Sequence, residues 1–186
     1  MTKNFFGKVF GLAILSASLI FSGCGSSASE NLSTQTAEAQ NKIQGQFPQF
    51  TTKDLNGEKV TSEIFAQKKI TVLNIWGTFC PPCIGEMPEL GEWNKNLPAD
   101  AQLVGLVCDV GGADDAKTIS DAKKILEQAD AKFLNIVPSE DIISFLQNID
   151  AVPTTIFIDA QGNIIGEPVI GAQVPEYKKK LQELLK

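Results

Sequence analysis

The chain has 186 residues, with 16 lysines against 22 acidic residues and a net charge of −6, and it contains neither arginine nor histidine. This length suits one well-buried domain. Without histidine there is no imidazole base and no Cys/His catalytic pair, and the commonest metal ligand is absent. The lack of arginine and the acidic balance argue against nucleic acid as a partner.

The N-terminus has the layout of an export signal. Lysines precede a short apolar stretch and then small residues that end at Cys24, which predicts a signal peptide over residues 1–23. Residues 21–24 resemble the lipobox of bacterial lipoproteins, in which the cysteine is lipidated, although Phe21 replaces the usual Leu. An ordinary signal peptide or an uncleaved anchor is the alternative.

A polar segment over residues 24–44 follows, and we expect it to be a flexible tether because it has almost no large apolar side chains to bury. The folded domain is expected over residues 45–186. It should begin with a β-hairpin, because Asn56-Gly57 is a turn signal between extendable flanks.

Two apolar runs, residues 70–76 and 102–109, predict strands covered on both faces. A helix between them makes the strands parallel neighbours in a right-handed βαβ unit. That helix is expected to bury Ile84, Met87 and Leu90.

The dithiol motif Cys80-Pro81-Pro82-Cys83 directly follows the first of these strands. When a helix begins at such a motif, unpaired backbone N–H groups lower the pKa of the first thiol from about 8.5 to roughly 3.5–7.5. Pro81 and Pro82 suit the first helical positions, where a missing N–H costs little. Cys80 is therefore the candidate nucleophile and Cys83 the resolving cysteine.

The second half of the chain predicts an amphipathic helix over residues 114–129 and a second helix that starts at a Ser139 cap. The Ser139 helix is expected to bury Ile142 and Ile143. A strand over 154–159, a hairpin through 170 and a last helix after Pro175 complete the domain.

Three motifs in this order carry a resemblance: residues 76–83, Glu86-Met87-Pro88, and the distal Val152-Pro153-Thr154. Together they resemble the TlpA/ResA-like branch of the thioredoxin superfamily. The resemblance implies an α/β thioredoxin fold with an N-terminal β-hairpin, an inserted helical segment within residues 114–138, and a central mixed sheet flanked by helices. It also implies electron transfer between dithiols outside the cytoplasm.

By this resemblance, Cys80 is the solvent-facing nucleophile and Cys83 the buried sulfur that resolves the mixed disulfide. Pro153 is implied to be a cis-proline opposite the motif, where the backbone of Val152 can pair with a substrate strand. A strand-initiating proline is the alternative for Pro153.

Glu86 lies about one helical turn after Cys83, where the family has a glutamate that tunes the cysteines. If partly buried, it should have a raised pKa, pass a proton to Cys83, and oppose thiolate formation when charged. A solvated helix glutamate is the alternative. Asn74 replaces the buried acid that thioredoxin itself has at this strand position.

Five residues are candidates for contact with substrate: Trp76, Phe79, Pro81, Pro82 and Val152. Core packing is the alternative for Trp76, whereas Phe79 offers an apolar surface for substrates to contact. The remaining cysteine, Cys108, is interpreted as a small core side chain rather than a third redox sulfur. Asp109 is expected to begin a loop.

The resulting hypothesis is a membrane-anchored, extracytoplasmic thiol–disulfide oxidoreductase, a reductase of protein or small-molecule disulfides. We expect no metal and no cofactor besides the Cys80–Cys83 couple, a membrane electron donor of the CcdA type, and a lipid anchor at Cys24. Alternatives are a disulfide oxidase or isomerase, and a soft-metal-binding lipoprotein, although a closed zinc site needs four ligands. A peroxidase would need a Thr-x-x-Cys motif, which Gly77 and Thr78 do not supply.

Overall fold

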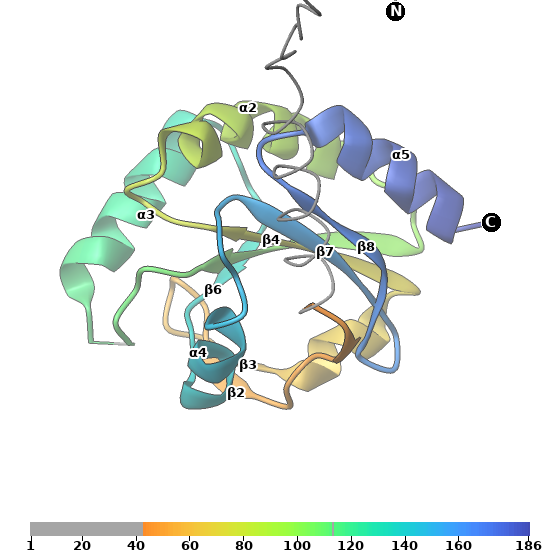
Figure 1. The fold of residues 1–186 in the computed structure, drawn as a ribbon. Coiled ribbons are helices and arrows are strands. Elements are labelled where there is room, and N and C mark those ends of the chain that lie inside the picture. Colours follow the sequence, from red (N-terminus) through yellow and green to blue (C-terminus); the bar gives the residue numbers. More distant parts are fainter. Residues whose placement is uncertain (1–42, 113) are drawn as a thin grey trace, which may run out of the picture.

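The computed structural model describes residues 43–112 and 114–186 (Figure 1). Its elements in chain order are β1 (Gly45–Gln46), β2 (Thr51–Lys53), β3 (Lys59–Thr61), the 3-10 helix η1 (Ser62–Gln67), β4 (Ile70–Trp76), α2 (Pro81–Lys95), β5 (Ala101–Val107), α3 (Ala116–Gln128), β6 (Leu134–Ile136), α4 (Glu140–Leu146), β7 (Thr154–Asp159), β8 (Asn163–Ile170) and α5 (Val174–Leu184). The predicted signal peptide and Cys24 lie outside the described residues. None of the helices in the described ranges is long and apolar enough to cross a membrane.

The main sheet has six strands in the order β1-β8-β7-β4-β5-β6. β5 is parallel to both β4 and β6, whereas β7 is antiparallel to β4 and β8 is antiparallel to β7. The predicted hairpin is β2–β3, which forms a separate two-stranded sheet and is joined to the chain just after β6, where the Val137 amide donates to the Lys53 carbonyl over 3.0 Å. The central mixed sheet and the hairpin are confirmed.

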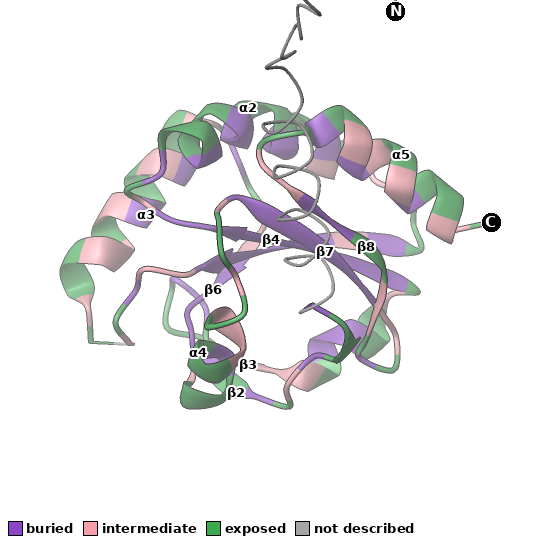
Figure 2. Ribbon diagram, in the orientation of Figure 1, coloured by how far each residue is buried: buried purple, intermediate pink, exposed green. Residues whose placement is uncertain are grey.

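Helices cover both faces of the sheet (Figure 1). α2, α3 and α5 lie on one face, and α4 and η1 lie on the other with the hairpin. Each face has its own apolar cluster, one that includes Met87, Leu90 and Leu181 and another that includes Phe47, Phe65 and Ile142. Figure 2 shows the result, a buried sheet between helices whose outer faces are exposed.

The strand β4 positions the chemistry. All 7 of its residues are buried, because it lies in the middle of a sheet covered on both sides. Side chains alternate along a strand, so Val72, Asn74 and Trp76 face the α2 side, while Leu73 and Ile75 pack into the opposite cluster. A polar amide is thus placed inside the core beneath α2.

Some expectations about elements were wrong or incomplete. The segment 114–138 supplies the strand β6 as well as a helix, and the three residues of β6 are too few to show a periodic pattern. Ile84 and Ile143 are exposed at 37% and 45%, since each lies on the outer side of its helix. Ile43, ahead of the expected start of the domain, is 2% exposed and belongs to the core.

Candidate active site

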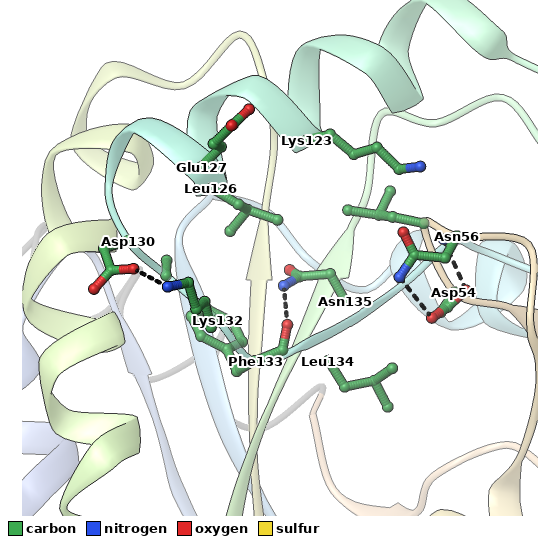
Figure 3. A pocket seen from close by; sticks show the side chains of 12 residues that line it. Asp54, Asn56, Lys123, Leu126, Glu127, Asp130, Lys132, Phe133, Leu134 and Asn135 are labelled. Atoms are coloured by element: carbon green, nitrogen blue, oxygen red, sulfur yellow. Dashed lines mark hydrogen bonds and ion pairs between the residues drawn. The ribbon is translucent and has the colours of Figure 1, made fainter.

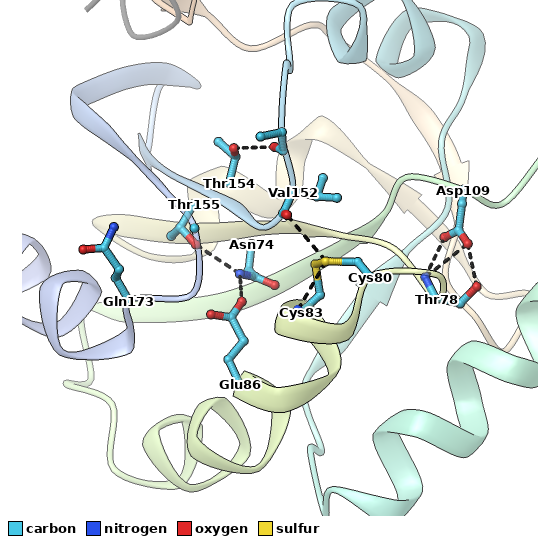
Figure 4. Close-up of a disulfide and its surroundings, with 12 residues drawn as sticks. Asn74, Thr78, Cys80, Cys83, Glu86, Asp109, Val152, Thr154, Thr155 and Gln173 are labelled. Atoms are coloured by element: carbon cyan, nitrogen blue, oxygen red, sulfur yellow. Dashed lines mark hydrogen bonds between the residues drawn. A yellow bond between two sulfur atoms is a disulfide. The ribbon is translucent and has the colours of Figure 1, made fainter. Parts of the chain in front are cut away.

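The two cysteines of the motif form a disulfide with an S–S distance of 2.12 Å at the start of α2 (Figure 4). Cys80 caps the helix, and its Sγ accepts a hydrogen bond from the backbone N–H of Cys83 over 3.3 Å. Cys83 is fully buried and Cys80 is 4% exposed. Cys80 is therefore the more accessible of the two cysteines, as expected, but little of it reaches the surface.

Apolar side chains surround the accessible sulfur. Phe79 is 66% exposed, and Pro81, Pro82 and Ile84 are exposed beside it. Val152, on the opposite side, is half-buried. Four of the five candidate substrate contacts thus lie within two residues of Cys80 in the chain or contact its sulfur. Exposed apolar side chains therefore lie close to Cys80 in the chain.

Trp76 is the exception, because it is fully buried. Its Nε1 donates to Oδ1 of Asn135 over 2.9 Å. Gly105 makes room for this bond, since a Cβ at that position would overlap Asn135 Oδ1 and lie 3.1 Å from Trp76 Nε1. Trp76 is a core residue in this arrangement, which removes it from the substrate-contacting set.

The loop before Cys80 is held by Asp109, a residue that sequence reasoning assigned to a loop without further role. Both carboxylate oxygens accept from the Thr78 backbone N–H at 3.1 Å, and Oδ2 also accepts from the Thr78 hydroxyl at 2.5 Å. The sequence pattern could have placed Asp109 near the motif. Asp109 follows a strand parallel to β4, and the carboxyl ends of parallel neighbours meet at one edge of the sheet. Asp109 fixes the approach of the chain to the motif.

The Val152–Pro153 peptide bond is cis, as the resemblance implies. The carbonyl oxygen of Val152 lies 3.5 Å from Cys80 Sγ, where it can accept from a reduced thiol (Figure 4). The Pro153 carbonyl accepts from the Gly171 N–H over 2.8 Å, which ties this loop to the end of β8. The 151–153 segment therefore forms the wall opposite the motif.

Glu86 points into the core rather than to solvent, with 5% of its surface exposed. Its Oε1 accepts from Asn74 Nδ2 at 2.8 Å, and its Oε2 lies 2.9 Å from the hydroxyl of Tyr177. Burial raises its pKa above the ordinary value for glutamate, although the two hydrogen bonds act in the opposite direction, and the charge of Glu89 adds to the rise. The solvated-helix alternative for Glu86 is thus wrong.

Asn74 has one polar atom without a partner. Its Nδ2 donates to Glu86 and also to Thr155 Oγ1 at 3.0 Å, whereas the buried Oδ1 accepts from no described residue. Figure 4 shows this oxygen on the side of the amide that faces the disulfide. A buried carbonyl without a donor is costly, so this oxygen is an available acceptor beneath the motif.

Two other features lie apart from the sulfur chemistry. Cys108 is half-buried, and burial raises the pKa of its thiol to about 11, with a smaller contribution from Asp109. In residues 43–112 and 114–186, no cluster of Cys, Asp or Glu could hold a metal ion.

A surface pocket of about 730 Å³ lies between α3 and the Asp54–Asn56 turn, and Figure 3 shows charges of both signs around it.

Comparisons with known proteins agree with this geometry. Residues 43–166 match the model of the AhpC/TSA family. The chain is 31% identical over 152 residues to the thiol-disulfide oxidoreductase ResA of Bacillus thuringiensis subsp. konkukian (strain 97-27), covering 81% of each protein.

Solved structures show the same fold at lower identity. A thioredoxin family thiol:disulfide interchange protein from Chlorobium tepidum TLS is 19% identical, with a TM-score of 0.63 over 77% of this chain and 97% of that chain. StoA from Bacillus subtilis is 20% identical, with a TM-score of 0.57 over 75% of this chain and 98% of that chain.

The paired sulfurs at a helix N-terminus, set in this mixed sheet opposite a cis-proline, define a thiol–disulfide oxidoreductase of the thioredoxin fold. The chain belongs to the AhpC/TSA family and to its ResA-type thiol-disulfide oxidoreductases. The structure brings together both cysteines, Glu86 and Pro153, which the sequence had singled out, and it adds contacts from Asp109 and Tyr177 that were not predicted from the sequence.

Proposed function

We propose that the chain works as a reductase of protein disulfides outside the cytoplasm. The observation that carries the direction is that one donor, the Cys83 N–H, is within hydrogen-bond distance of Cys80 Sγ in the described part of the chain. An oxidant such as DsbA owes its high potential to a stabilised reduced form, so a poorly stabilised thiolate favours the opposite direction.

The start of α2 explains this scarcity. A helix N-cap side chain accepts from the N–H of the second or third helical residue. Here the first two residues of α2 are Pro81 and Pro82, which have no N–H. The Cys83 N–H is therefore the first backbone donor of the helix, and at 3.3 Å it is the one that reaches Cys80 Sγ.

The charges around the sulfurs act in the same direction. The sequence has no arginine or histidine to stabilise a thiolate. The groups near the sulfurs include the Val152 carbonyl oxygen and the buried Glu86, and neither favours a neighbouring negative charge. Electrons held on this dithiol are thus readily given to a client disulfide.

The proposed reaction has two exchange steps. The Cys80 thiolate attacks one sulfur of the client disulfide, the client S–S bond breaks, and the other client sulfur leaves as a thiolate that takes up a proton. Cys83 then loses its proton, attacks Cys80 Sγ, and releases the second client sulfur as a thiol. Two electrons pass to the client and the Cys80–Cys83 disulfide of this structure is formed.

Glu86 is proposed to accept the proton of Cys83 in the second step. It lies three positions further along α2, about one helical turn away, and its raised pKa makes the carboxylate a better base than a solvated one. Asn74 and Tyr177 hold the carboxyl group in place.

Extended polypeptide disulfides are the proposed substrates. Phe79 and the neighbouring prolines offer an exposed apolar surface beside Cys80, and the cis-proline loop presents backbone groups on the opposite side. The oxidised protein then needs electrons, for which we propose a membrane donor of the CcdA type. The export signal and Cys24 support anchoring to the membrane by lipid.

Covalent trapping tests the exchange reaction. A Cys83→Ser protein should form a stable mixed disulfide between Cys80 and a disulfide-containing client such as insulin. The Cys80→Ser protein should form none. Wild-type protein should accelerate insulin reduction by dithiothreitol. A Cys80→Ser protein that retains this activity would contradict the mechanism. Mass spectrometry of the Cys24 thioether tests the anchor separately.

A further inference from the structure

Tyr177 lies on the first turn of α5, outside residues 43–166 that match the family model. Its side chain is fully buried, and its hydroxyl has three partners within 3.2 Å, while the Thr155 side chain also acts on it. The Gln173 N–H donates to it at 3.2 Å, while the Gly171 carbonyl lies at 2.7 Å and Glu86 Oε2 at 2.9 Å. This phenol therefore joins the C-terminal helix to the carboxyl group beneath the disulfide.

The hydrogens in this cluster can be counted. A phenol has one proton to donate and two lone pairs. The Gln173 N–H uses one lone pair, and the proton has two candidate acceptors, Gly171 and Glu86. An ionised Glu86 competes with the Gly171 carbonyl for that proton. A neutral Glu86 no longer accepts the Tyr177 proton and can donate to the phenol oxygen, where it shares the second lone pair with Thr155, and the Tyr177 proton is then free for Gly171.

Gly171 connects this choice to the reacting sulfur. Its N–H donates to the Pro153 carbonyl at 2.8 Å, and the adjacent Val152 carbonyl lies 3.5 Å from Cys80 Sγ. The contacts thus run from Glu86 through Tyr177 and Gly171 to the loop that faces the disulfide.

We propose that Tyr177 is a positioning residue that passes the protonation state of Glu86 to the loop carrying Val152 and Pro153. Its single proton goes to Gly171 when Glu86 is neutral and to Glu86 when Glu86 is ionised. The proposal rests on thiol–disulfide exchange at Cys80, and it requires neither the reductase direction nor the membrane anchor.

The groups that face Glu86 support this assignment. Asn74 from β4 is a neutral donor, and burial raises the pKa of the Tyr177 hydroxyl, which keeps its proton. Glu89 acts on Glu86 from the next turn of α2, and it forms an ion pair with Lys178 at 2.8 Å on the surface. Glu86, whose pKa is raised by burial, is therefore the group in this cluster that changes charge, while Tyr177 stays protonated.

A titration by nuclear magnetic resonance tests the relay in the oxidised protein. The side-chain carboxyl carbon of Glu86 and the backbone amide of Gly171 are followed from pH 4 to 9. In the wild type, the Gly171 amide should show an inflection at the Glu86 midpoint. In Tyr177→Phe that inflection should vanish, and the Glu86 midpoint should rise by about one unit, because the ionised form loses one of its two donors, Asn74 remaining as the other.

Two further variants separate the relay from a structural effect. Lys178→Met alters the neighbouring surface of α5 and should leave both inflections in place. Glu86→Gln keeps Tyr177 and should abolish the Gly171 inflection even if Tyr177→Phe does not fold. A Gly171 inflection that persists in Glu86→Gln or in Tyr177→Phe overturns the proposal. A protein that shows the relay but reduces no client disulfide overturns the proposed function instead.

Discussion

Asn74 and Glu86 are joined by a hydrogen bond of 2.8 Å from Nδ2 to Oε1, which links the middle of β4 to the second turn of α2. The bond lies beneath the disulfide (Figure 4). A neutral amide thus occupies the strand position where thioredoxin has an acid, and the titratable group of the interior is on the helix instead. Glu86 keeps its side chain buried because Asn74 and Tyr177 supply partners for both of its oxygens.

Glu86→Gln should flatten the pH dependence of stability. Burial raises the pKa of Glu86 in the folded state, so between its unfolded value of about 4.3 and its folded pKa the native state binds more protons. The free energy of unfolding contributed by this group is therefore full below about pH 4.3 and falls as the pH rises through the folded pKa. Urea unfolding of the oxidised proteins from pH 4 to 8 measures the difference between wild type and variant. A difference that does not change with pH would contradict the assignment.

Pro82→Ala should make the protein more oxidising. The change restores the N–H of the second helical residue, which is placed to donate to the N-cap sulfur of Cys80. A hydrogen bond to a charged group contributes about 1.5 kcal/mol or more, so the equilibrium constant with glutathione should shift about tenfold toward the dithiol form.

Pro81→Ala is the matched control for this prediction. The N–H of the first helical residue does not reach the N-cap side chain, so the equilibrium with glutathione should move much less. Equal shifts in the two variants would show that Pro82 has no special effect on the Cys80 thiolate.

Gly105→Ala should destabilise the fold. The added Cβ overlaps Asn135 Oδ1, which accepts from Trp76 Nε1. Overpacking of this kind costs about 1–3 kcal/mol, and thermal unfolding measures it. Gly85→Ala is the control, because nothing lies within 4 Å of a Cβ at that helical position, and it should stabilise by about 0.5–1 kcal/mol. Similar losses in both variants would refute the packing argument.

Cys108 should react slowly with iodoacetamide after full reduction. Its pKa of about 11 leaves a small thiolate fraction at pH 8, roughly one molecule in a thousand, and the thiolate is the reactive form. Mass spectrometry over time should show Cys80 modified well before Cys108. Comparable rates would mean that Cys108 is an accessible thiol and that its interpretation as a core residue is wrong.

The fold was predictable where the sequence pattern was long. The apolar run 70–76 has the bounds of β4, and Asn56-Gly57 predicted the hairpin turn, where Gly57 has a φ of +88°. β1 and β6 have 2 and 3 residues, so they become strands through pairing with neighbours rather than through local preference. Ile84 was assigned to the core because periodicity alone does not locate the edge of a buried stripe.

The site was predictable where residue type and spacing carry chemistry. The Cys80–Cys83 pair can be recognised from its spacing in the sequence alone. Asp109 and Tyr177, in contrast, act through partners 31 and 91 residues away in sequence. Tyr177 has the periodicity of an inward helix residue, so its hydroxyl contact with Glu86 could not be distinguished from ordinary packing. Trp76 is the converse case, a residue next to the motif whose side chain points into the core.

The reduction potential of the Cys80–Cys83 couple tests the central claim most directly. Equilibration of the protein with dithiothreitol and glutathione buffers, read by the fraction of disulfide, gives this value. Because the Cys83 N–H is the one N–H of α2 that reaches Cys80 Sγ, the thiolate is weakly stabilised. The couple should therefore have a potential at or below about −270 mV, the value of thioredoxin. A potential near −120 mV, the value of DsbA, would show that the protein donates its disulfide and would contradict the account.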